Sequence, residues 1–457
     1  MMRAVLKSLV IVAASVLLLL GLGLGVYLAS RAVGPSAEEA SALALLDRPQ
    51  HVGDRDGSAA LYTLDLDMPD AEREPLLAAD VALFAAAQPD GQGRRRWRSG
   101  REHWPVLGRS GRDDPKWCHS RDSDCLQQVR AAPEDYAALL DRDRELVDRV
   151  EALLVYDHFQ NRFPFRPDMP LPSYQWSLRP LTRNALRFAT GEVDLALAGT
   201  CKGITQGRVL IDAGDNLIGS MLGVALVRGH GELLASMLAE LPRTYPLPDA
   251  CAAALSRPLQ TQQATCRAMT AEGRWSVSGM RQIVADTRDA SAGIEGMFGW
   301  VVLDGERSAA RIAPRFTWFC GDHAAALVES DAPLVDPSGP PSRWSLACAS
   351  NIAGCTLADI AAPAYVDYGL RLQDSEASLR TLSALLWLRA RPGPIDADAL
   401  AALPVDMTSA ARPLRLDAEG ATLGTPLYSH REKQSVADDV WRIPLPASRL
   451  QPAPAAP

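Results

Sequence analysis

The sequence contains few of the motifs that indicate a particular reaction. No C-x-x-C pair occurs, no two of the seven histidines have H-E-x-x-H spacing, and neither a P-loop nor a dinucleotide fingerprint is present. Positive charge is not in excess either, because 47 Lys and Arg residues face 55 Asp and Glu residues, a net charge of −8. These absences argue against zinc, nucleotides and nucleic acids as ligands, and we expect neither a cofactor nor a nucleic-acid partner.

Aromatic residues are also scarce, at 6% of the chain, whereas Ala and Leu are abundant. The hydrophobic content of 47% and the charged content of 22% are typical of a folded protein rather than a disordered one. This composition favours helices. The chain beyond residue 30 is long enough for one large domain or two closely packed ones.

Charged side chains are absent from residues 8–30, where the chain consists almost entirely of Val, Ile, Leu, Ala and Gly. A helix of this length spans a hydrocarbon core of ~30 Å at ~1.5 Å per residue. We therefore predict a tail over 1–7, a transmembrane anchor over 8–30 and a linker over 31–56. A cleaved signal peptide is the alternative, with Ser30-Arg31-Ala32 as its candidate cleavage site.

The residues that flank the span predict its orientation. Arg3 and Lys7 precede it, whereas Arg31 is the only basic residue that follows closely. Positive charge favours the cytoplasmic side, so we expect a single-pass protein of the inner membrane with a cytoplasmic tail and a periplasmic domain. Gly21 and Gly25 form a G-x-x-x-G pattern, which would allow two such helices to approach.

The cysteines agree with that orientation. There are eight of them, all beyond the span, and an even number is expected where thiols pair in an oxidising compartment. Buried reduced thiols are the alternative. Proximity along the sequence predicts bridges Cys118–Cys125, Cys348–Cys355 and Cys251–Cys266, which leaves Cys201 and Cys320 to join distant segments.

Apolar residues recur at three- and four-residue intervals in many segments, which predicts helices. The predicted helices cover 133–158, 174–190, 192–210, 216–227, 249–255, 260–289, 357–389 and 396–403, with a short helix that ends at Pro242. We expect Gly229-His230-Gly231 to break the chain, and Pro180 and Pro363 to lie in first turns. Short connections make such helices pack as antiparallel hairpins.

The C-terminal part has a different pattern. Short extended segments at 413–416, 422–428 and 440–445 predict a small antiparallel β element. Residues 60–67 also read as extended, 297–303 fit either state, and the Pro- and Ala-rich tail 451–457 is expected to be disordered.

The sequence thus predicts a mainly α protein. We expect one N-terminal transmembrane helix and an irregular helical-hairpin domain over 57–450. A subdivision is possible near 245–290, and the β-containing end is expected at 405–450. A tetratricopeptide array is disfavoured because no 34-residue period repeats.

Six short segments carry a resemblance to a known family. They are GSAALYTLDLDMP at 57–69, Cys125-Leu126, YDHF at 156–159, LIGSM at 217–221, NIAG at 351–354 and RPLRLD at 412–417. They resemble an uncharacterised family of membrane-anchored, largely helical envelope proteins of Gram-negative bacteria. The resemblance implies an anchored, helical envelope protein and carries no activity with it.

Two candidate nucleophiles have simpler structural interpretations. Cys320 lies close in sequence to Asp322 and His323, and a thiol–imidazole pair could act as a nucleophile, but Cys320 is more simply half of a disulfide. Ser220 lies between Gly219 and Gly223, where a helical pattern predicts a packing residue rather than a hydrolase elbow.

Paired carboxylates could cleave glycans, and two pairs are available. Glu192 and Asp194 begin a predicted helix, where acidic residues are favoured by the helix dipole. Asp212 lies near the end of that helix, and Asp215 is placed to cap the next one.

Residues 91–116 are rich in arginine and contain Trp97 and Trp104. Outside the cytoplasm, such a segment could contact anionic lipid head groups or cell-wall polymers. A solvated loop is the alternative that we favour.

We assign no catalytic, cofactor-binding or metal-binding residue from the sequence. The leading hypothesis is a non-enzymatic, membrane-anchored periplasmic binding or scaffold protein with a protein partner in the envelope, because helical hairpins often build concave binding surfaces. The alternative is an envelope hydrolase that acts on cell-wall or lipid substrates.

Overall fold

The computed structural model describes residues 2–48, 53–88, 96–108, 115–120, 124–290, 302–338, 345–429 and 440–446. Up to residue 255 its α-helices are α1 (Met2–Ala32), α2 (Ala37–Leu46), α3 (Ser58–Tyr62), α4 (Asp70–Ala86), α5 (Cys125–Ala131), α6 (Pro133–Arg142), α7 (Arg144–Ala152), α8 (Arg179–Ala189), α9 (Val193–Asp212), α10 (Leu217–Glu240) and α11 (Asp249–Leu255). Then follow α12 (Thr261–Ala290), α14 (Gly305–Ile312), α15 (Pro314–Thr317), α16 (Asp322–Glu329), α17 (Ile352–Ala390) and α18 (Ala397–Ala401).

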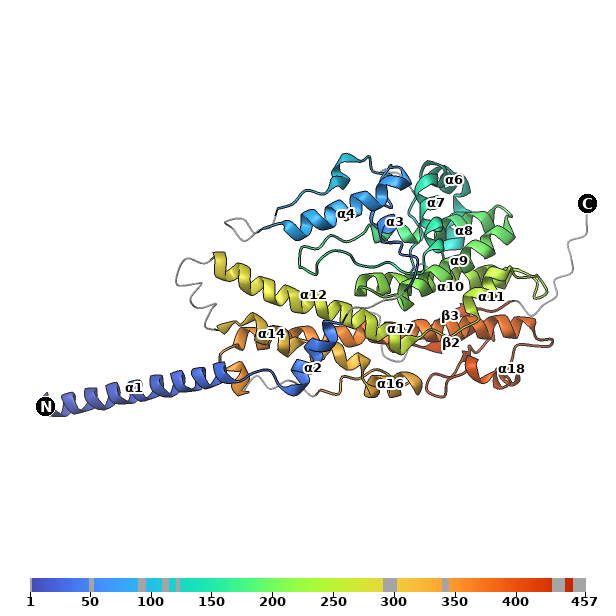
Figure 1. Ribbon diagram of the computed structural model, residues 1–457. Coiled ribbons are helices and arrows are strands. Elements are labelled where there is room, and N and C mark those ends of the chain that lie inside the picture. The colour runs from blue at the N-terminus through green and yellow to red at the C-terminus, as the bar shows by residue number, and fades with distance from the viewer. Residues whose placement is uncertain are drawn as a thin grey trace, which may run out of the picture.

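The strands lie at the C-terminal end of the chain. They are β1 (Arg415–Leu416), β2 (Thr422–Pro426) and β3 (Val440–Pro444), which form an antiparallel sheet in the order β1-β2-β3. The predicted fold class, mainly helical with a small C-terminal antiparallel sheet, is confirmed (Figure 1). The tail 451–457 and most of 297–303 lie outside the described residues.

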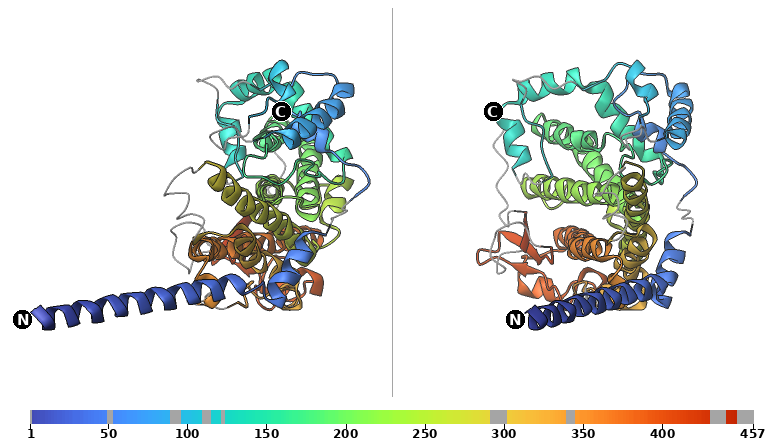
Figure 2. Two further views of the ribbon diagram at one scale, coloured as in Figure 1. Left: turned by 60° about the vertical axis from the view of Figure 1, so that its left-hand side comes forward. Right: turned by 90° about the vertical axis from the view of Figure 1, so that its left-hand side faces the viewer.

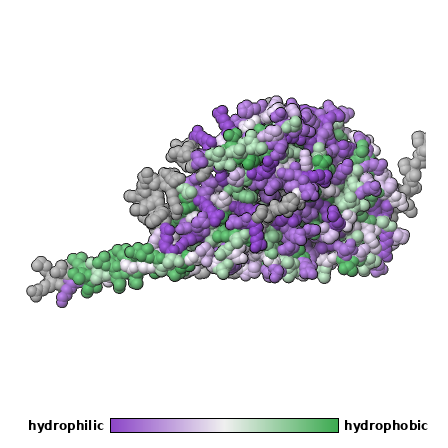
Figure 3. Space-filling model, viewed as in Figure 1, coloured by the Kyte–Doolittle hydropathy of each residue, from purple (hydrophilic) through white to green (hydrophobic). Residues whose placement is uncertain are grey.

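The N-terminal helix stands apart from the rest of the chain. α1 projects from the domain as a rod, and its surface is apolar along most of its length, whereas the domain has a mixed surface (Figures 2 and 3). Its span Leu9–Ala32 is long and apolar enough to cross a membrane and is unburied, while α10 meets the same criteria but is mostly buried in the domain. An apolar N-terminal helix together with four disulfides indicates an extracytoplasmic domain.

The disulfides confirm half of the predicted pairing. Cys118 bonds Cys125 and Cys348 bonds Cys355, as expected. The other prediction was wrong, because the long-range bridges are Cys201–Cys251, from α9 to α11, and Cys266–Cys320, from α12 to the turn before α16. Cys251 and Cys266 are close in sequence but lie on different helices, α11 and α12, each of which packs against another partner.

The core is built around a pair of long helices, α9 and α10, with α17 packed on α10. The backbones of α9 and α10 approach closely at Gly207 and Gly223. A Cβ added to Gly223 would lie 2.5 Å from the carbonyl oxygen of Gly207. Glycine is required at this crossing because no side chain fits between the helices.

Glycine also explains why the predicted break in α10 was wrong. α10 continues through Gly229-His230-Gly231, and a Cβ on Gly231 would lie 2.9 Å from a methyl group of Leu382 on α17. These glycines therefore allow close helix packing instead of ending the helix.

Three other boundaries differ from the predictions. The segment 133–158 is split into α6 and α7 at Asp143, whose backbone leaves the helical region (φ −99°, ψ 17°). Residues 60–67 begin as α3 rather than as a strand, because Leu61, Tyr62 and Leu64 are all buried and the alternation was not that of a one-sided strand. Pro363 lies well inside α17, whereas Pro180 lies in the first turn of α8, as expected.

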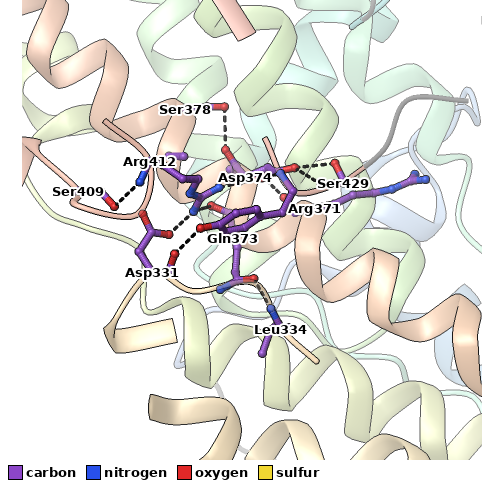
Figure 4. A network of polar contacts seen from close by, with 12 residues as sticks. Asp331, Leu334, Arg371, Gln373, Asp374, Ser378, Ser409, Arg412 and Ser429 are labelled. Carbon is purple, nitrogen blue, oxygen red and sulfur yellow. Dashed lines mark hydrogen bonds and ion pairs between the residues drawn. The ribbon is translucent and has the colours of Figure 1, made fainter. Parts of the chain in front are cut away.

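A buried ion network attaches the C-terminal end to α17 (Figure 4). Arg412, only 1% exposed, donates from Nη1 to Oδ1 of Asp374 at 2.8 Å and from Nη2 to Asp331. The backbone N–H groups of Tyr428 and Ser429 donate to the same Asp374 carboxylate at 2.8 and 2.9 Å, and the Ser429 hydroxyl adds a third bond at 2.5 Å. The network thus holds the segments on both sides of the first hairpin against one helix.

Candidate functional site

The structure separates the candidate residues predicted from the sequence. Cys320 is bonded to Cys266, so its favoured interpretation as half of a disulfide is confirmed, and the alternative Cys320–His323 nucleophile has no free thiol. His323 is exposed, and its Nε2 lies 3.2 Å from the carbonyl oxygen of Val335. Ser220 is fully buried in α10 and donates to the carbonyl oxygen of Asn216, which is a packing role.

The acidic candidates lie at helix ends. Asp194 is in the first turn of α9 and accepts a hydrogen bond from the Tyr245 hydroxyl at 2.8 Å. Burial raises the pKa of Asp212 and raises that of Asp215 to about 6, while the Asn161 N–H donates to Asp215 and lowers its pKa in part. The cavity beside Asp215 measures only about 10 Å³, which leaves no room for a substrate.

The described part of the arginine-rich segment is packed on the protein in part, while Arg96, Arg98 and Lys116 are exposed. Arg101 donates to Asp65 at 2.8 Å and lies over the Tyr62 ring. Trp97 packs edge-to-face on Phe84. Arg94, Arg95, Arg109 and Arg112 lie outside the described residues.

A cleft of about 490 Å³ lies between the start of α10, the middle of α12, α17 and the segment 165–171. Its volume falls in the range of ~300–1,000 Å³ that is usual for small-molecule sites. The aromatic side chains that line it are Phe165, Trp275, Tyr365 and Tyr368. Aliphatic side chains complete the wall, among them Leu171, Ile218 and Met221.

Helical spacing and a proline-rich segment position these side chains. Glu272 and Trp275 are three residues apart on α12, as are Tyr365 and Tyr368 on α17, so each pair shares one helix face. The segment over 161–173 is held on α12 because Trp275 Nε1 donates to the carbonyl oxygen of Arg166 at 2.9 Å. This hydrogen bond attaches the wall over 165–171 to α12.

Glu272 is the only charged side chain among the described residues that line the cleft. Its Oε1 accepts a hydrogen bond from the Tyr365 hydroxyl at 3.3 Å. Burial raises the pKa of the Glu272 carboxyl, and the Tyr365 hydrogen bond lowers it in part. Burial also raises the pKa of Tyr365 to about 12, and its ring packs edge-to-face on Phe316 with centroids 4.4 Å apart.

Neighbouring charges are directed elsewhere. Arg166 pairs with Asp168 at 2.9 Å and donates to the carbonyl oxygen of Phe84. Arg371 lies over the Tyr368 ring and pairs with Asp367 at 2.7 Å. The cleft is therefore an apolar, aromatic site with one acidic group, an arrangement suited to binding.

Sequence reasoning missed this site, although parts of its signal were present. Tyr365 and Tyr368 lie in the predicted helix over 357–389, whose pattern indicates packing alone. Trp275 and Glu272 lie in a weak helical pattern that gave no sign of a ligand. Comparison with protein-family models, with curated proteins and with solved structures finds no match to this chain.

Proposed function

We propose that this protein is a membrane-anchored binding protein that takes a small apolar ligand in the cleft between α10, α12 and α17. The observation that carries the proposal is the cleft itself, about 490 Å³ in volume with an aromatic and aliphatic wall. An apolar pocket with few polar groups is the usual form of a ligand site. The protein is a single-pass protein of the inner membrane in this proposal, with its domain in the periplasm.

The junction of α1 with the domain supports a retained anchor over a cleaved signal. Ser30 is fully buried, and its hydroxyl lies 2.7 Å from that of Ser350, whose N–H also donates to it at 2.9 Å. Arg307 donates to the carbonyl oxygen of Ser30 at 2.7 Å, and Arg31 pairs with Asp304 at 3.3 Å. Cleavage after Ala32 would remove these partners from a buried polar cluster, which is costly.

The arrangement of the helices supports a position of the cleft near the membrane. α1 and the C-terminal end of α12 point to the same side of the domain (Figures 1 and 2). The helix that carries Glu272 and Trp275 therefore runs toward the bilayer in an anchored protein, which favours a ligand that partitions there. The resemblance to membrane-anchored envelope proteins supports the same placement.

The hydrolase alternative has less support. Its thiol candidate is oxidised, and its acidic candidates face no cavity of substrate size in the described part of the chain. Glu272 is a single carboxyl, whereas glycan cleavage usually needs a second one at a defined separation.

Binding can be tested with the full chain in lipid nanodiscs and a small neutral aromatic, benzyl alcohol, observed by saturation-transfer NMR against empty nanodiscs. We expect binding that is lost in Met221→Trp, because the larger ring fills the cleft. Leu195→Trp, at an exposed position of α9, is the matched control and should bind as the unaltered chain does. Equal binding by the two variants would reject the cleft as the site.

The anchor can be tested by intact mass and a C-terminal alkaline phosphatase fusion. We expect a mature chain that retains residues 1–32, sediments with membranes and supports phosphatase activity. A mature chain that begins at Val33 and is recovered in the soluble fraction would show a cleaved signal instead.

A further inference from the structure

Among the described residues, the Glu272 carboxylate has no positively charged partner. The Tyr365 hydroxyl is the one hydrogen-bond donor that reaches it there, and no salt bridge does. Glu272 is half-buried, and a carboxylate that loses part of its water is usually stabilised by a cation, because desolvation of an unpaired charge is costly. The missing partner is thus a feature of the cleft that its packing does not explain.

The groups that face Glu272 provide no substitute. From α17 these are Tyr365 and Tyr368, both neutral hydroxyls. α10 contributes only the Asn216 amide near the cleft, and that amide caps α10 by accepting from the Gly219 N–H at 2.7 Å. The segment 165–171 lines the cleft with apolar side chains alone. At neutral pH the lining therefore carries a negative charge or none, and no positive one.

The aromatic rings favour the same kind of ligand. Trp, Tyr and Phe rings present negative faces, and a cation within ~6 Å of such a ring is attracted to it, most strongly where water is excluded. Trp275, Phe165, Tyr365 and Tyr368 all line the cleft that also contains Glu272. Rings and carboxylate together match a positive charge that is attached to an apolar body.

We propose that the ligand of this cleft is an apolar monocation, a molecule with one amine or quaternary ammonium group on an aliphatic or aromatic body. The amine pairs with Glu272, the rings surround the charge, and the body lies against Leu171, Ile218 and Met221. This inference rests on the proposed binding function and assigns its ligand class. Burial raises the pKa of the Glu272 carboxyl, and a bound cation would offset that cost.

An anionic or zwitterionic lipid fits less well. A phosphate would meet the Glu272 carboxylate with no arginine or lysine in the lining to neutralise it. The proposal therefore commits to a ligand without a neighbouring negative charge, whether it arrives from the membrane or from the aqueous phase.

The test compares three water-soluble probes of similar size on the full chain in nanodiscs, with empty nanodiscs as the blank. The probes are benzyltrimethylammonium, benzyl alcohol and phenylacetate, and the measurement is the dissociation constant by calorimetry. We expect the order benzyltrimethylammonium, then benzyl alcohol, then phenylacetate. Glu272→Gln should weaken binding of the cation about tenfold, since the variant loses the charge–charge attraction between the carboxylate and the ammonium group, and should leave benzyl alcohol within about twofold.

Glu329→Gln is the matched control, because Glu329 is exposed on α16 and does not line the cleft. It should change none of the three dissociation constants. Equal affinities for the cation and the neutral probe, or cation binding that survives Glu272→Gln, would overturn the ligand class while leaving the binding function in place. Failure of all three probes to bind would reject the binding function and the ligand class together. The benzyltrimethylammonium titration is repeated in nanodiscs without anionic lipid, to separate binding to the protein from adsorption to the bilayer. Binding that occurs only in nanodiscs with anionic lipid would reject the cleft as the cation site.

Discussion

Two acidic side chains of this protein, the buried Asp374 and the half-buried Glu272, have opposite surroundings. Asp374, on α17, accepts hydrogen bonds from Arg412, from two backbone N–H groups and from the Ser429 hydroxyl (Figure 4). Glu272, on α12, accepts one bond, from Tyr365. The two helices pack on each other, so the two acids belong to the same part of the domain.

The difference indicates that Asp374 stabilises the fold, whereas Glu272 is available to bind a ligand. A buried polar network stabilises one conformation when all of its members have partners, and it is costly when one of them lacks a partner. Both oxygens of Asp374 have hydrogen-bond donors, and the network fixes the segments around the first hairpin on α17. Glu272 lacks a cationic partner among the described residues, and because it lies in an open cleft, a ligand can supply that charge.

The largest expected loss of stability comes from removing Arg412, the cation that pairs with Asp331 and Asp374. Arg412→Met leaves Asp331 and Asp374 without their shared partner, so the free energy of unfolding should fall by about 3–5 kcal/mol. Thermal and denaturant unfolding of the full chain in nanodiscs would measure this loss.

Arg371→Met is the control for that experiment. Arg371 is on α17, the helix that carries Asp374, and it is half-exposed. Its salt-bridge partner among the described residues is Asp367. Its loss should cost at most about 1 kcal/mol, because exposed pairs contribute little. Similar losses in the two variants would mean that the Asp374 network is not the structural element described here.

A second prediction concerns the bridge that holds α12, the helix that carries Glu272. The Cys266–Cys320 bridge closes a sequence separation of 54, whereas Cys118–Cys125 closes one of 7. Chain-entropy arguments make the longer bridge worth about 2 kcal/mol more. Replacement of each cysteine pair by serines, followed by denaturant unfolding, should show that difference, and equal losses would contradict it.

The helices could be predicted because their signal is local. The 3.6-residue recurrence of apolar residues in α8, α9 and α12 depends only on neighbours in the sequence, and so do the short extended segments that indicated β2 and β3. Predictions failed where a distant contact decides the backbone. Gly231 reads as a break and is instead a close contact with Leu382.

The candidate site could not be predicted for the same reason. Its walls come from four segments, around residues 167, 218, 272 and 365, which meet only in the folded chain. The cysteines show the same limit. Local pairs such as Cys118–Cys125 follow from proximity, whereas Cys201–Cys251 and Cys266–Cys320 depend on how α9, α11 and α12 pack.

The smallest expected change in stability comes from Glu272. Because burial raises the pKa of Glu272 in the folded chain, the folded state binds the Glu272 proton more tightly than the unfolded state does. Below the ordinary pKa of about 4.3 both states are protonated and the group has no effect on stability. As the pH rises through the raised folded pKa, the carboxylate forms in its apolar cleft and stability is lost.

Glu272→Gln imitates the protonated form at every pH. We expect it to raise the free energy of unfolding at pH 7 by about 1 kcal/mol or less, and to leave it unchanged at pH 4. Thermal unfolding of the full chain at the two pH values measures both numbers, with Glu329→Gln as the exposed control that should shift neither. A variant that gained stability at pH 7 while losing cation binding would show that the acid is kept at a cost to the fold, as a ligand-binding group is. A variant destabilised at pH 7 would instead place Glu272 with Asp374, among the acids that hold the structure together.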